Sequence, residues 1–465
     1  MKYFLNINKI NTSKVILADD NVELTCGELL SFIEQFKNKI PERSLVFLFS
    51  ENTVISVSYY LACLQAKVVP LILGVNTDFE LTTNLINTYT PNYLILPEKI
   101  ASKYHGEIIW NTKGYSVIKL NLDKHEMYSE LALLLPTSGS TGSSKLVRHS
   151  YVNIESSASN VSSFFELNDS DKAFMFLPMY YTMGLSIINS YLKTGASVLL
   201  TNASLTDSKF WSSIKTRGIT SITGVPYSFE IFKKMRFFNM KFPDLKILTQ
   251  GGGKLSEDLY NDCVVYAQNN NIKFIPTYGQ TEGTARLTYL DPKFSSIKRG
   301  SIGKSIPNGL ITIIDENGIE INENYAEGEM IFKGQNVTLG YAVILKDLKL
   351  GDEFKGVLYT GDIVKRDEDG FLFITGRKSR FLKLYGIRVS LDEIENLIVN
   401  KFDIECIAAG NDTMMKVYVV DYLKTKEIEE FISNKTGLYH KSFQVIPIEK
   451  IPRSETGKVI YNILD

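Results

Sequence analysis

The sequence predicts an α/β protein with a large amino-terminal domain of helix-covered parallel sheets, a small β unit, and a small α+β carboxyl-terminal domain. Between residues 44 and 276, short apolar runs alternate with longer stretches whose apolar residues recur at helical spacing. Parallel strands joined by helices produce this alternation. From about residue 285, glycines recur between short β-branched runs, which indicates a small antiparallel unit. A third part begins near residue 379 with a capped helix and short strands.

The composition narrows the class of protein. A length of 465 residues suits one large and one small domain, and 44% hydrophobic with 22% charged residues is ordinary for a soluble globular protein. The net charge of −1 offers no basic surplus for nucleic acid. The four cysteines are scattered without a C-x-x-C pair, which argues against a zinc site or a disulfide framework. No signal peptide is evident and no apolar run reaches the ~20 residues of a membrane helix, so we expect a cytoplasmic protein without a membrane partner.

The expected elements of the large domain follow one another with short connections. Before residue 100 we expect helices at residues 27–37, 54–65 and 81–89, and strands at residues 44–50, 67–74 and 92–96. After residue 130 we expect strands at residues 131–135, 173–178, 197–201, 220–225, 245–249 and 273–276, and helices at residues 151–166, 184–193, 208–216 and 256–269. Ligands of such sheets bind beyond the carboxyl ends of the strands.

We place the domain boundary at residue 379, so that residues 1–378 form the large domain, with residues 285–378 as its β-rich part, and residues 379–465 the small one. Ser390 and Glu393 have the spacing of a capping box for a helix through residue 399. Strands at residues 404–409 and 416–420, a helix at residues 426–434 and a strand-like stretch at residues 443–451 complete this part.

A loop rich in glycine and hydroxyl groups follows the strand at residues 131–135. Its candidate ligand-binding residues are Thr137, Ser138, Gly139, Ser140, Thr141, Gly142 and Lys145. Glycines let several N–H groups face one point, hydroxyls add donors and the lysine adds a positive charge, which together suit a polyphosphate. The spacing is not that of a Walker loop, and the alternative is a flexible surface loop.

Two further motifs follow strands. The stretch Tyr278-Gly279-Gln280-Thr281-Glu282 offers an aromatic ring for a base, a hydroxyl for a phosphate and a carboxylate for magnesium. Three glycines, Gly251, Gly252 and Gly253, would let a flat group approach the backbone. Either motif alone could be an ordinary turn at the end of a strand.

Three motifs lie nearer the carboxyl terminus. Asp362 ends a turn and could accept from two ribose hydroxyls. A basic run at residues 376–383 includes Arg377 and Lys383, and such a run is more often a solvated face. Lys458 ends the stretch Pro452-Arg453-Ser454-Glu455-Thr456-Gly457-Lys458, where a lysine after glycine is usually just exposed.

In this order and spacing the motifs resemble those of the AMP-forming adenylating enzymes: acyl-CoA synthetases, luciferases and adenylation domains of peptide synthetases. The resemblance also includes Gly328-Glu329 and Gly340-Tyr341 and extends over almost the whole chain. It implies that ATP and Mg²⁺ bind, with the loop at residues 137–145 on the β- and γ-phosphates.

The resemblance implies a role for each remaining motif. Tyr278 would stack on adenine, with Gly279 and Gln280 among the cofactor-binding residues, and Gly251 to Gly253 would line the adenine and acyl sites. Thr281 would bind the α-phosphate, Glu282 the magnesium, and Asp362 with Arg377 the ribose. Lys458 would bridge the substrate carboxylate and the α-phosphate. The small, mobile carboxyl-terminal domain would then rotate at the hinge Ser379 and present Lys383 and its neighbours to a thiol.

The acyl site is expected between Tyr180, Tyr181, Gly184, Gly224 and the Gly251–Gly253 stretch. Where the family often has His, this chain has Tyr181, and the usual Asp or Lys of the hinge is replaced by Ser379. Relatives that activate amino acids carry an Asp near residues 181–184, which is missing here, so a small carboxylic acid without an α-ammonium group is favoured.

The predicted reaction joins an acid and ATP to give acyl-AMP and pyrophosphate, followed by transfer to a thiol. The thiol belongs to coenzyme A or to the phosphopantetheine arm of an acyl carrier protein. The alternatives are an amino-acid:carrier ligase and a non-catalytic nucleotide-binding scaffold.

Overall fold

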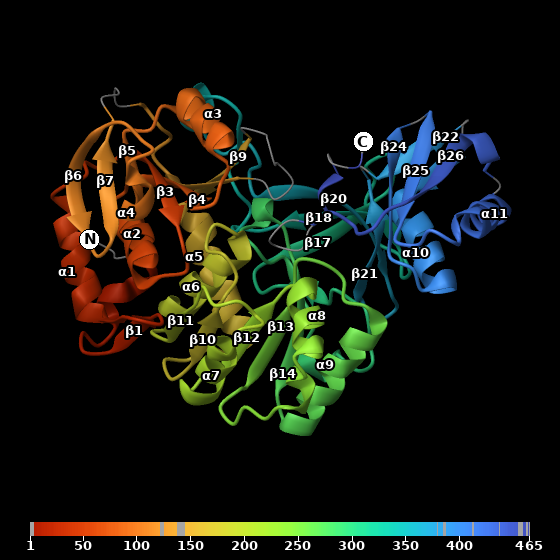
Figure 1. Ribbon diagram of the computed structural model, residues 1–465, viewed down its shortest axis with the longest axis horizontal. Helices are drawn as coiled ribbons and strands as arrows, with labels where there is room; N and C mark the ends of the chain where they lie inside the picture. Colours follow the sequence, from red (N-terminus) through yellow and green to blue (C-terminus); the bar gives the residue numbers. More distant parts are fainter. Residues whose placement is uncertain are drawn as a thin grey trace. The chain divides into compact units, whose positions relative to one another are not determined.

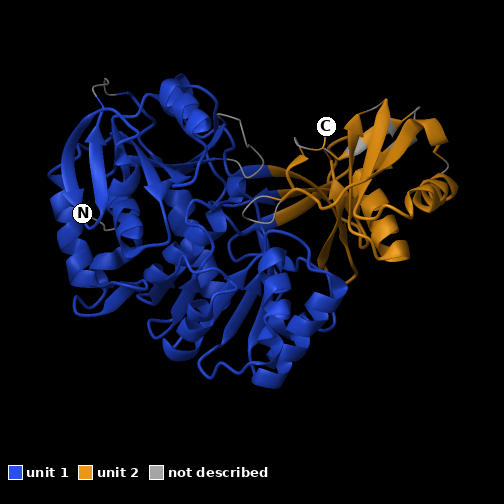
Figure 2. Ribbon diagram, viewed as in Figure 1, with its two compact units in different colours: residues 1–310, 332–358 blue, residues 311–331, 359–465 orange. Residues whose placement is uncertain are grey.

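The computed structural model describes residues 4–120, 125–136, 145–378, 380–384, 387–411, 413–436, 438–453, 459–461 and 464. Contacts between residues divide the chain into two compact units (Figure 2). Unit 1 comprises residues 1–310 and 332–358, and unit 2 comprises residues 311–331 and 359–465. The β-rich part expected at residues 285–378 is therefore shared between the units, and the domain boundary at residue 379 stays a prediction.

The first sheet of unit 1 is parallel in its middle, as the alternating pattern predicts (Figure 1). Neighbouring strands run parallel from β14 to β1, and β2, β15 and β16 add antiparallel edges. In spatial order the strands are β16 (Lys304–Ser305), β15 (Thr288–Tyr289), β14 (Lys273–Tyr278), β13 (Ile247–Gln250), β12 (Ser221–Gly224), β10 (Lys172–Met175), β11 (Ser197–Leu200), β1 (Val15–Ala18) and β2 (Glu23–Thr25).

The second sheet of unit 1 has a parallel centre, β5-β3-β4-β8, flanked by antiparallel strands. Its spatial order is β19 (Gly340–Ala342), β9 (Leu146–Ser150), β8 (Leu131–Pro136), β4 (Val69–Gly74), β3 (Leu45–Ser50), β5 (Tyr93–Pro97), β7 (Tyr115–Lys119) and β6 (Glu107–Thr112). The loop predicted to bind phosphate leaves β8, but residues 137–144 lie outside the described residues.

Helices cover the sheets in layers, because each has an apolar face that must be buried. One core joins both sheets to α1 (Cys26–Lys37), α2 (Val54–Gln65), α5 (Tyr151–Phe165) and α6 (Thr182–Lys193). The other face of the first sheet is covered by α7 (Ser208–Thr216), α8 (Pro226–Lys234) and α9 (Glu257–Asn270), as Figure 1 shows. Helix α3 (Phe79–Tyr89) packs on the outer face of the second sheet.

Several elements of unit 1 were not expected, among them α8, β9 and the hairpin of β6 and β7. Helix α8 begins at Pro226, directly after the strand expected at residues 220–225, and proline fits the first position of a helix. Strand β9 contains the polar residues Arg148 and His149, which hid its buried character. The hairpin of β6 and β7 lies in a partly exposed stretch without a clear apolar period.

Unit 2 is α+β, as expected for the carboxyl-terminal part. It contains most of the four-stranded sheet of β17 (Leu310–Ile314), β18 (Glu327–Lys333), β20 (Val357–Arg366) and β21 (Leu372–Arg377), in which β20 and β21 run antiparallel, and the antiparallel pair β22 (Phe381–Leu384) and β23 (Ile387–Ser390). A further sheet joins β24 (Cys406–Asn411), β25 (Met414–Val419) and β26 (Phe443–Pro447), with α10 (Leu391–Phe402) and α11 (Thr425–Thr436). The predicted cap of α10 is confirmed, since the Ser390 side chain accepts from the N–H of Glu393.

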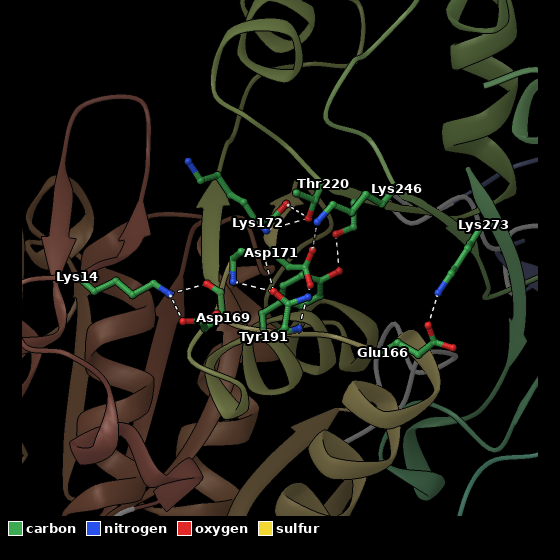
Figure 3. A network of polar contacts seen from close by, with 12 residues as sticks. Lys14, Glu166, Asp169, Asp171, Lys172, Tyr191, Thr220, Lys246 and Lys273 are labelled. Atoms are coloured by element: carbon green, nitrogen blue, oxygen red, sulfur yellow. Dashed lines mark hydrogen bonds and ion pairs between the residues drawn. The ribbon is translucent and has the colours of Figure 1, made fainter. Parts of the chain in front are cut away.

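The amino-terminal ends of the first sheet's strands are closed by structural polar contacts (Figure 3). Lys246, just before β13, pairs with the buried carboxylate of Asp171, just before β10, at 3.2 Å. The Thr220 hydroxyl accepts from the N–H of Lys172 at 2.9 Å. These contacts tie strand ends together, and the predicted site residues follow the opposite, carboxyl ends of the strands.

Candidate active site

A lysine, a tyrosine and a glutamate from three motifs meet in unit 1. The ammonium nitrogen of Lys145 lies 3.5 Å from the centroid of the Tyr341 ring, a cation–π contact. The Tyr341 hydroxyl donates to Oε1 of Glu282 at 2.9 Å. Burial, followed by the Glu282 charge, raises the pKa of Tyr341 well above its usual value, so the hydroxyl keeps its proton. A cation and an acidic oxygen are thus fixed on one aromatic ring.

The segment that carries Glu282 is held in a tight backbone fold after β14. A Cβ atom at Gly279 would lie 1.5 Å from the carbonyl oxygen of Ala285, so only glycine fits there. Thr284 and Ala285 have left-handed φ angles of 50° and 87°. Such conformations cost on the order of 1–3 kcal/mol each and cluster at functional sites. The backbone oxygen of Glu282 also accepts from the N–H of Thr338 at 2.9 Å.

The carboxylate of Glu282 is better suited to a magnesium ion that arrives with a nucleotide than to a metal ion held by protein side chains alone. Among the described residues, no group of three or more His, Cys, Asp or Glu side chains could hold a metal ion. Magnesium that arrives with nucleotide phosphates needs only one or two protein carboxylates. Glu282, half-buried and oriented by Tyr341, has the chemistry of such a ligand, and its magnesium role stays a prediction.

The other residues of the Tyr278–Glu282 motif are also fixed. The Gln280 side-chain amide donates to the Tyr278 hydroxyl at 2.9 Å. The Thr281 hydroxyl accepts from the Thr182 hydroxyl at 3.1 Å, which leaves the Thr281 proton available for an acceptor such as a phosphate oxygen.

The three segments expected to form the acyl site do come together. A Cβ atom at Gly252 would lie 2.8 Å from the Tyr181 hydroxyl and 3.2 Å from Val225. A Cβ atom at Gly251 would lie 2.7 Å from the terminal carbon of Met183. Gly252 has a φ angle of 81°, which also favours glycine. Tyr181 and Met183 therefore occupy the space beside the glycines.

The remaining residues of the expected acyl site have packing roles in the structure. The Tyr180 ring packs on Gly74, where a Cβ atom would lie 2.7 Å from the ring. Gly184 lets the start of α6 approach the carbonyl of Pro178, and Gly224 faces the Phe229 ring. The acyl-binding role of these residues stays a prediction.

The pair expected to bind ribose is formed in unit 2. Asp362 and Arg377 face each other across β20 and β21, and Arg377 Nε donates to the buried carboxylate of Asp362 at 3.0 Å. Next to it, Lys378 pairs with the buried Glu329 of the Gly328-Glu329 motif at 2.8 Å. Of the residues expected to serve thiol transfer, Lys383 pairs with Arg388 in the backbone ladder, and that role stays a prediction. Ser379 and Lys458 lie outside the described residues.

The sequence analysis did not single out the buried basic residues near the site, among them His149 and Arg286. His149 and Arg286 are fully buried in unit 1. His149 lines a small cavity between β8, α5 and α6, and burial lowers its pKa to about 3, so it is neutral. Arg286 donates to the Ser186 hydroxyl on α6. The sequence signal for Arg286 was a basic residue between the apolar Ala285 and Leu287. Residue order alone does not show that such a side chain is buried.

The chain is similar to known proteins over most of its length. A sequence model described as AMP-binding enzyme matches residues 9–342, well over half of the chain. A 2-succinylbenzoate–CoA ligase of Staphylococcus epidermidis is 24% identical and aligns over 97% of this chain and 94% of its own. A ligase of the same name from Geobacillus sp. is 26% identical over 90% of this chain and 87% of its own.

Solved structures share the fold. The O-succinylbenzoate coenzyme A synthetase of Bacillus subtilis in complex with AMP has a TM-score of 0.79 at 20% identity, with 100% of this chain and 98% of that chain covered. The ATP-bound MatB of Rhodopseudomonas palustris has a TM-score of 0.78 at 20% identity, with the same coverage. The expected α/β fold is confirmed. Within the described residues, no helix has the length and hydropathy to cross a membrane.

Proposed function

The chain belongs to the family of AMP-binding enzymes, and from that premise we propose that it activates a small carboxylic acid as acyl-AMP and transfers the acyl group to coenzyme A. Its relatives are named as acid–CoA ligases, and similar structures bind AMP, ATP or ATP with magnesium. The observation that carries the proposal is the Lys145–Tyr341–Glu282 cluster, which joins three separate motifs beside the carboxyl end of β14.

In the first step, a carboxylate oxygen of the acid attacks the α-phosphorus of ATP, the bond to the bridging oxygen breaks, and pyrophosphate leaves. Lys145 would bind phosphate oxygens, and the Thr281 hydroxyl would donate to the α-phosphate. Glu282 would hold Mg²⁺, which neutralises phosphate charge when it is bound. Positioning and electrostatic stabilisation are the main contributions of a protein to such transfers.

In the second step, a thiolate sulfur attacks the acyl carbonyl, and AMP leaves. We infer that Lys458 serves the first step and the Lys383 to Arg388 segment the second, with rotation at Ser379 between them. The matching of these residues to the family's motifs supports this assignment. The Asp362–Arg377 pair offers both an acceptor and a donor, which suits ribose hydroxyls.

The acid is proposed to be compact. Tyr181 and Met183 fill the space beside Gly251 and Gly252, which favours a short or compact acid, so that acids of about two to eight carbons should be activated better than long-chain fatty acids. Because an apolar pocket gains ~0.8 kcal/mol per buried methylene, the preference should be steep. The relatives are named for 2-succinylbenzoate, which is therefore the first acid to test.

An acyl carrier protein is the alternative to coenzyme A as the acceptor of the acyl group. The four buried, unpaired cysteines support a reducing, cytoplasmic location.

The test is ATP–pyrophosphate exchange across a panel of acids that includes 2-succinylbenzoate, short and long fatty acids and amino acids. We expect exchange with compact acids, and exchange only with amino acids or long fatty acids would contradict the proposal. Thioester formation with coenzyme A and with a loaded carrier protein then identifies the acceptor. Glu282→Gln should abolish most exchange through lost magnesium, and full activity of this variant at limiting magnesium would remove Glu282 from that role.

Lys458→Ala separates the two steps. Loss of one preorganised charge should reduce acyl-AMP formation roughly 100- to 1000-fold. Thioester formation from supplied acyl-AMP should proceed at near the normal rate, whereas a substitution at Lys383 should show the reverse. Equal losses in both steps for Lys458→Ala would contradict alternation between the two steps.

A further inference from the structure

Arg286 is a buried cation with no acidic partner in the part of the chain that the structure describes. Its side chain is 1% exposed, and one terminal nitrogen donates to the Ser186 hydroxyl. Its Nε and Nη2 atoms have no hydrogen-bond partner among the residues that the structure describes. Burying a guanidinium costs several kcal/mol unless acceptors replace the lost water. Within the described residues, hydrogen bonds offset only part of the free-energy cost of burying this guanidinium.

The described residues around Arg286 do not supply hydrogen-bond acceptors for its Nε and Nη2 atoms. The guanidinium lies 5.3 Å from the centroid of the Phe165 ring, which attracts a cation but replaces no hydrogen bond in the guanidinium plane. Burial lowers the pKa of Arg286 to about 10, and the Tyr191 and Tyr181 hydroxyls are the titratable groups that counter this shift. The side chain therefore remains charged near neutral pH.

The position of Arg286 connects it with the expected acyl site. Ser186, which accepts from Arg286, lies on α6. The same helix carries Met183 near its start and is preceded by Tyr181, and these two side chains lie beside Gly251 and Gly252. Burial raises the pKa of the Tyr181 hydroxyl and the charge of Arg286 lowers it, so the two side chains are close enough to interact electrostatically. Ser186 lines a small cavity with further polar side chains: His149, Ser157, Thr182, Asn189 and Thr284.

The main chain at Arg286 is firmly held. The Asn336 amide donates to the carbonyl oxygens of Gly283 at 2.8 Å and Arg286 at 3.3 Å. This anchoring, with the left-handed residues Thr284 and Ala285 just before it, fixes the guanidinium on the same short segment that carries Glu282. A preorganised cation loses little entropy when it binds an anion.

We propose that Arg286 binds a second anionic group of the acid, so that the substrate class is a dicarboxylic acid or a comparable acid with two negative charges. One carboxylate is activated at the α-phosphate, and the other accepts from the unpartnered Nε and Nη2 atoms in the two-point geometry that guanidinium and carboxylate share. This inference rests on the proposed function.

The experiment compares acids of matched length with one or two carboxylates: butanoate with butanedioate, and hexanoate with hexanedioate. ATP–pyrophosphate exchange is measured for the wild type, Arg286→Met, which removes the charge, and Arg286→Lys, which keeps it. Arg299→Met, the same substitution at an exposed arginine, is the matched control. Thermal stabilisation of each protein by the same acids without ATP gives a second measurement that does not depend on catalysis.

We expect wild-type kcat/KM to favour each dicarboxylate at least 100-fold, since a site built to hydrogen-bond a group rejects an analogue that lacks it. Arg286→Met should invert this ratio, Arg286→Lys should restore part of it, and Arg299→Met should keep it. Only dicarboxylates should stabilise the wild type, and not Arg286→Met.

The outcomes separate this inference from the proposed function. Exchange with equal or better use of the monocarboxylates overturns the inference and leaves the ligase function standing. No exchange with any acid, together with stabilisation by dicarboxylates that depends on Arg286, overturns the function and supports the anion site. If neither pyrophosphate exchange nor thermal stabilisation is observed with any acid, both the proposed function and the anion site are overturned.

Discussion

Arg148 and Arg286 are both fully buried in unit 1, but their surroundings differ completely. Arg148 on β9 donates to the carbonyl oxygens of Leu339, Tyr341, Leu350 and Gly351 and pairs with the Glu353 carboxylate. Arg286 has one hydroxyl acceptor within the described chain. A guanidinium presents five N–H donors. The described residues therefore supply hydrogen-bond acceptors for Arg148, whereas the Nε and Nη2 donors of Arg286 have no acceptor among them and can bind a ligand.

This difference separates a structural cation from a binding one. Arg148 connects β9 with β19 and with the segment at residues 350–353, so its bonds stabilise the fold. Arg286 connects little, yet lies on the segment that carries Glu282. Burial alone thus says nothing about function, whereas burial without acceptors points to a ligand.

The largest expected effect is on stability at Arg148. Arg148→Met removes the side-chain donors of four backbone carbonyls, although the Leu339 carbonyl still accepts from the N–H of Glu353, and breaking such a buried network should cost about 3–5 kcal/mol of unfolding free energy. Urea unfolding at pH 7 measures it, with the exposed Arg299→Met as control. A loss below 1 kcal/mol would mean that Arg148 is no more structural than Arg286.

His149, the neighbour of Arg148, avoids a buried charge by staying neutral. Burial lowers its pKa to about 3, below the ~6.5 expected in the unfolded chain. Between these values the unfolded state binds the proton and the folded state does not, so stability is fully present above pH ~6.5 and is lost as the pH falls. At pH 5 the loss should be about 2 kcal/mol.

His149→Asn tests this expectation through the pH dependence of urea unfolding. The loss of stability between pH 7 and pH 5 should be smaller in the variant by about 2 kcal/mol. The same substitution at the exposed His440 is the control. An identical pH dependence in wild type and His149→Asn would show that His149 takes up its proton in the folded state.

Tyr341 links the structural arginine to the candidate site, since its carbonyl accepts from Arg148 and its hydroxyl donates to Glu282. Tyr341→Phe keeps the ring under Lys145 and removes only the hydroxyl bond, worth about 1 kcal/mol. We expect the unfolding free energy to fall by no more than about 1 kcal/mol and the magnesium requirement in pyrophosphate exchange to rise about 5-fold. An unchanged magnesium requirement would show that Glu282 needs no orientation by Tyr341.

The smallest expected change in stability is at Arg286. Replacing an uncompensated buried cation by an apolar side chain of similar length is often neutral or stabilising, so Arg286→Met should unfold within about 1 kcal/mol of wild type or be more stable. Calorimetry without ligand measures the midpoint. A loss as large as that of Arg148→Met would assign Arg286 a structural role.

The sequence by itself determined the layered α/β architecture and the motifs at the carboxyl ends of the strands. Apolar period and strand–helix alternation follow from local residue order, and helices α2 and α7 begin and end at the predicted residues. The residues of the Tyr278–Glu282 motif were likewise recognised from type and spacing. Strand β9 and helix α8 were missed because their pattern is ambiguous until neighbouring elements bury them.

Only the tertiary structure decided which residues act together. The contact of Lys145 and Glu282 through Tyr341 joins positions far apart in the chain, and no local pattern encodes it. The same holds for the two arginines, which are one residue type in the sequence. Their difference arises from the acceptors that distant segments bring to Arg148 and do not bring to Arg286, because the cost of burying a charge is set by its three-dimensional surroundings.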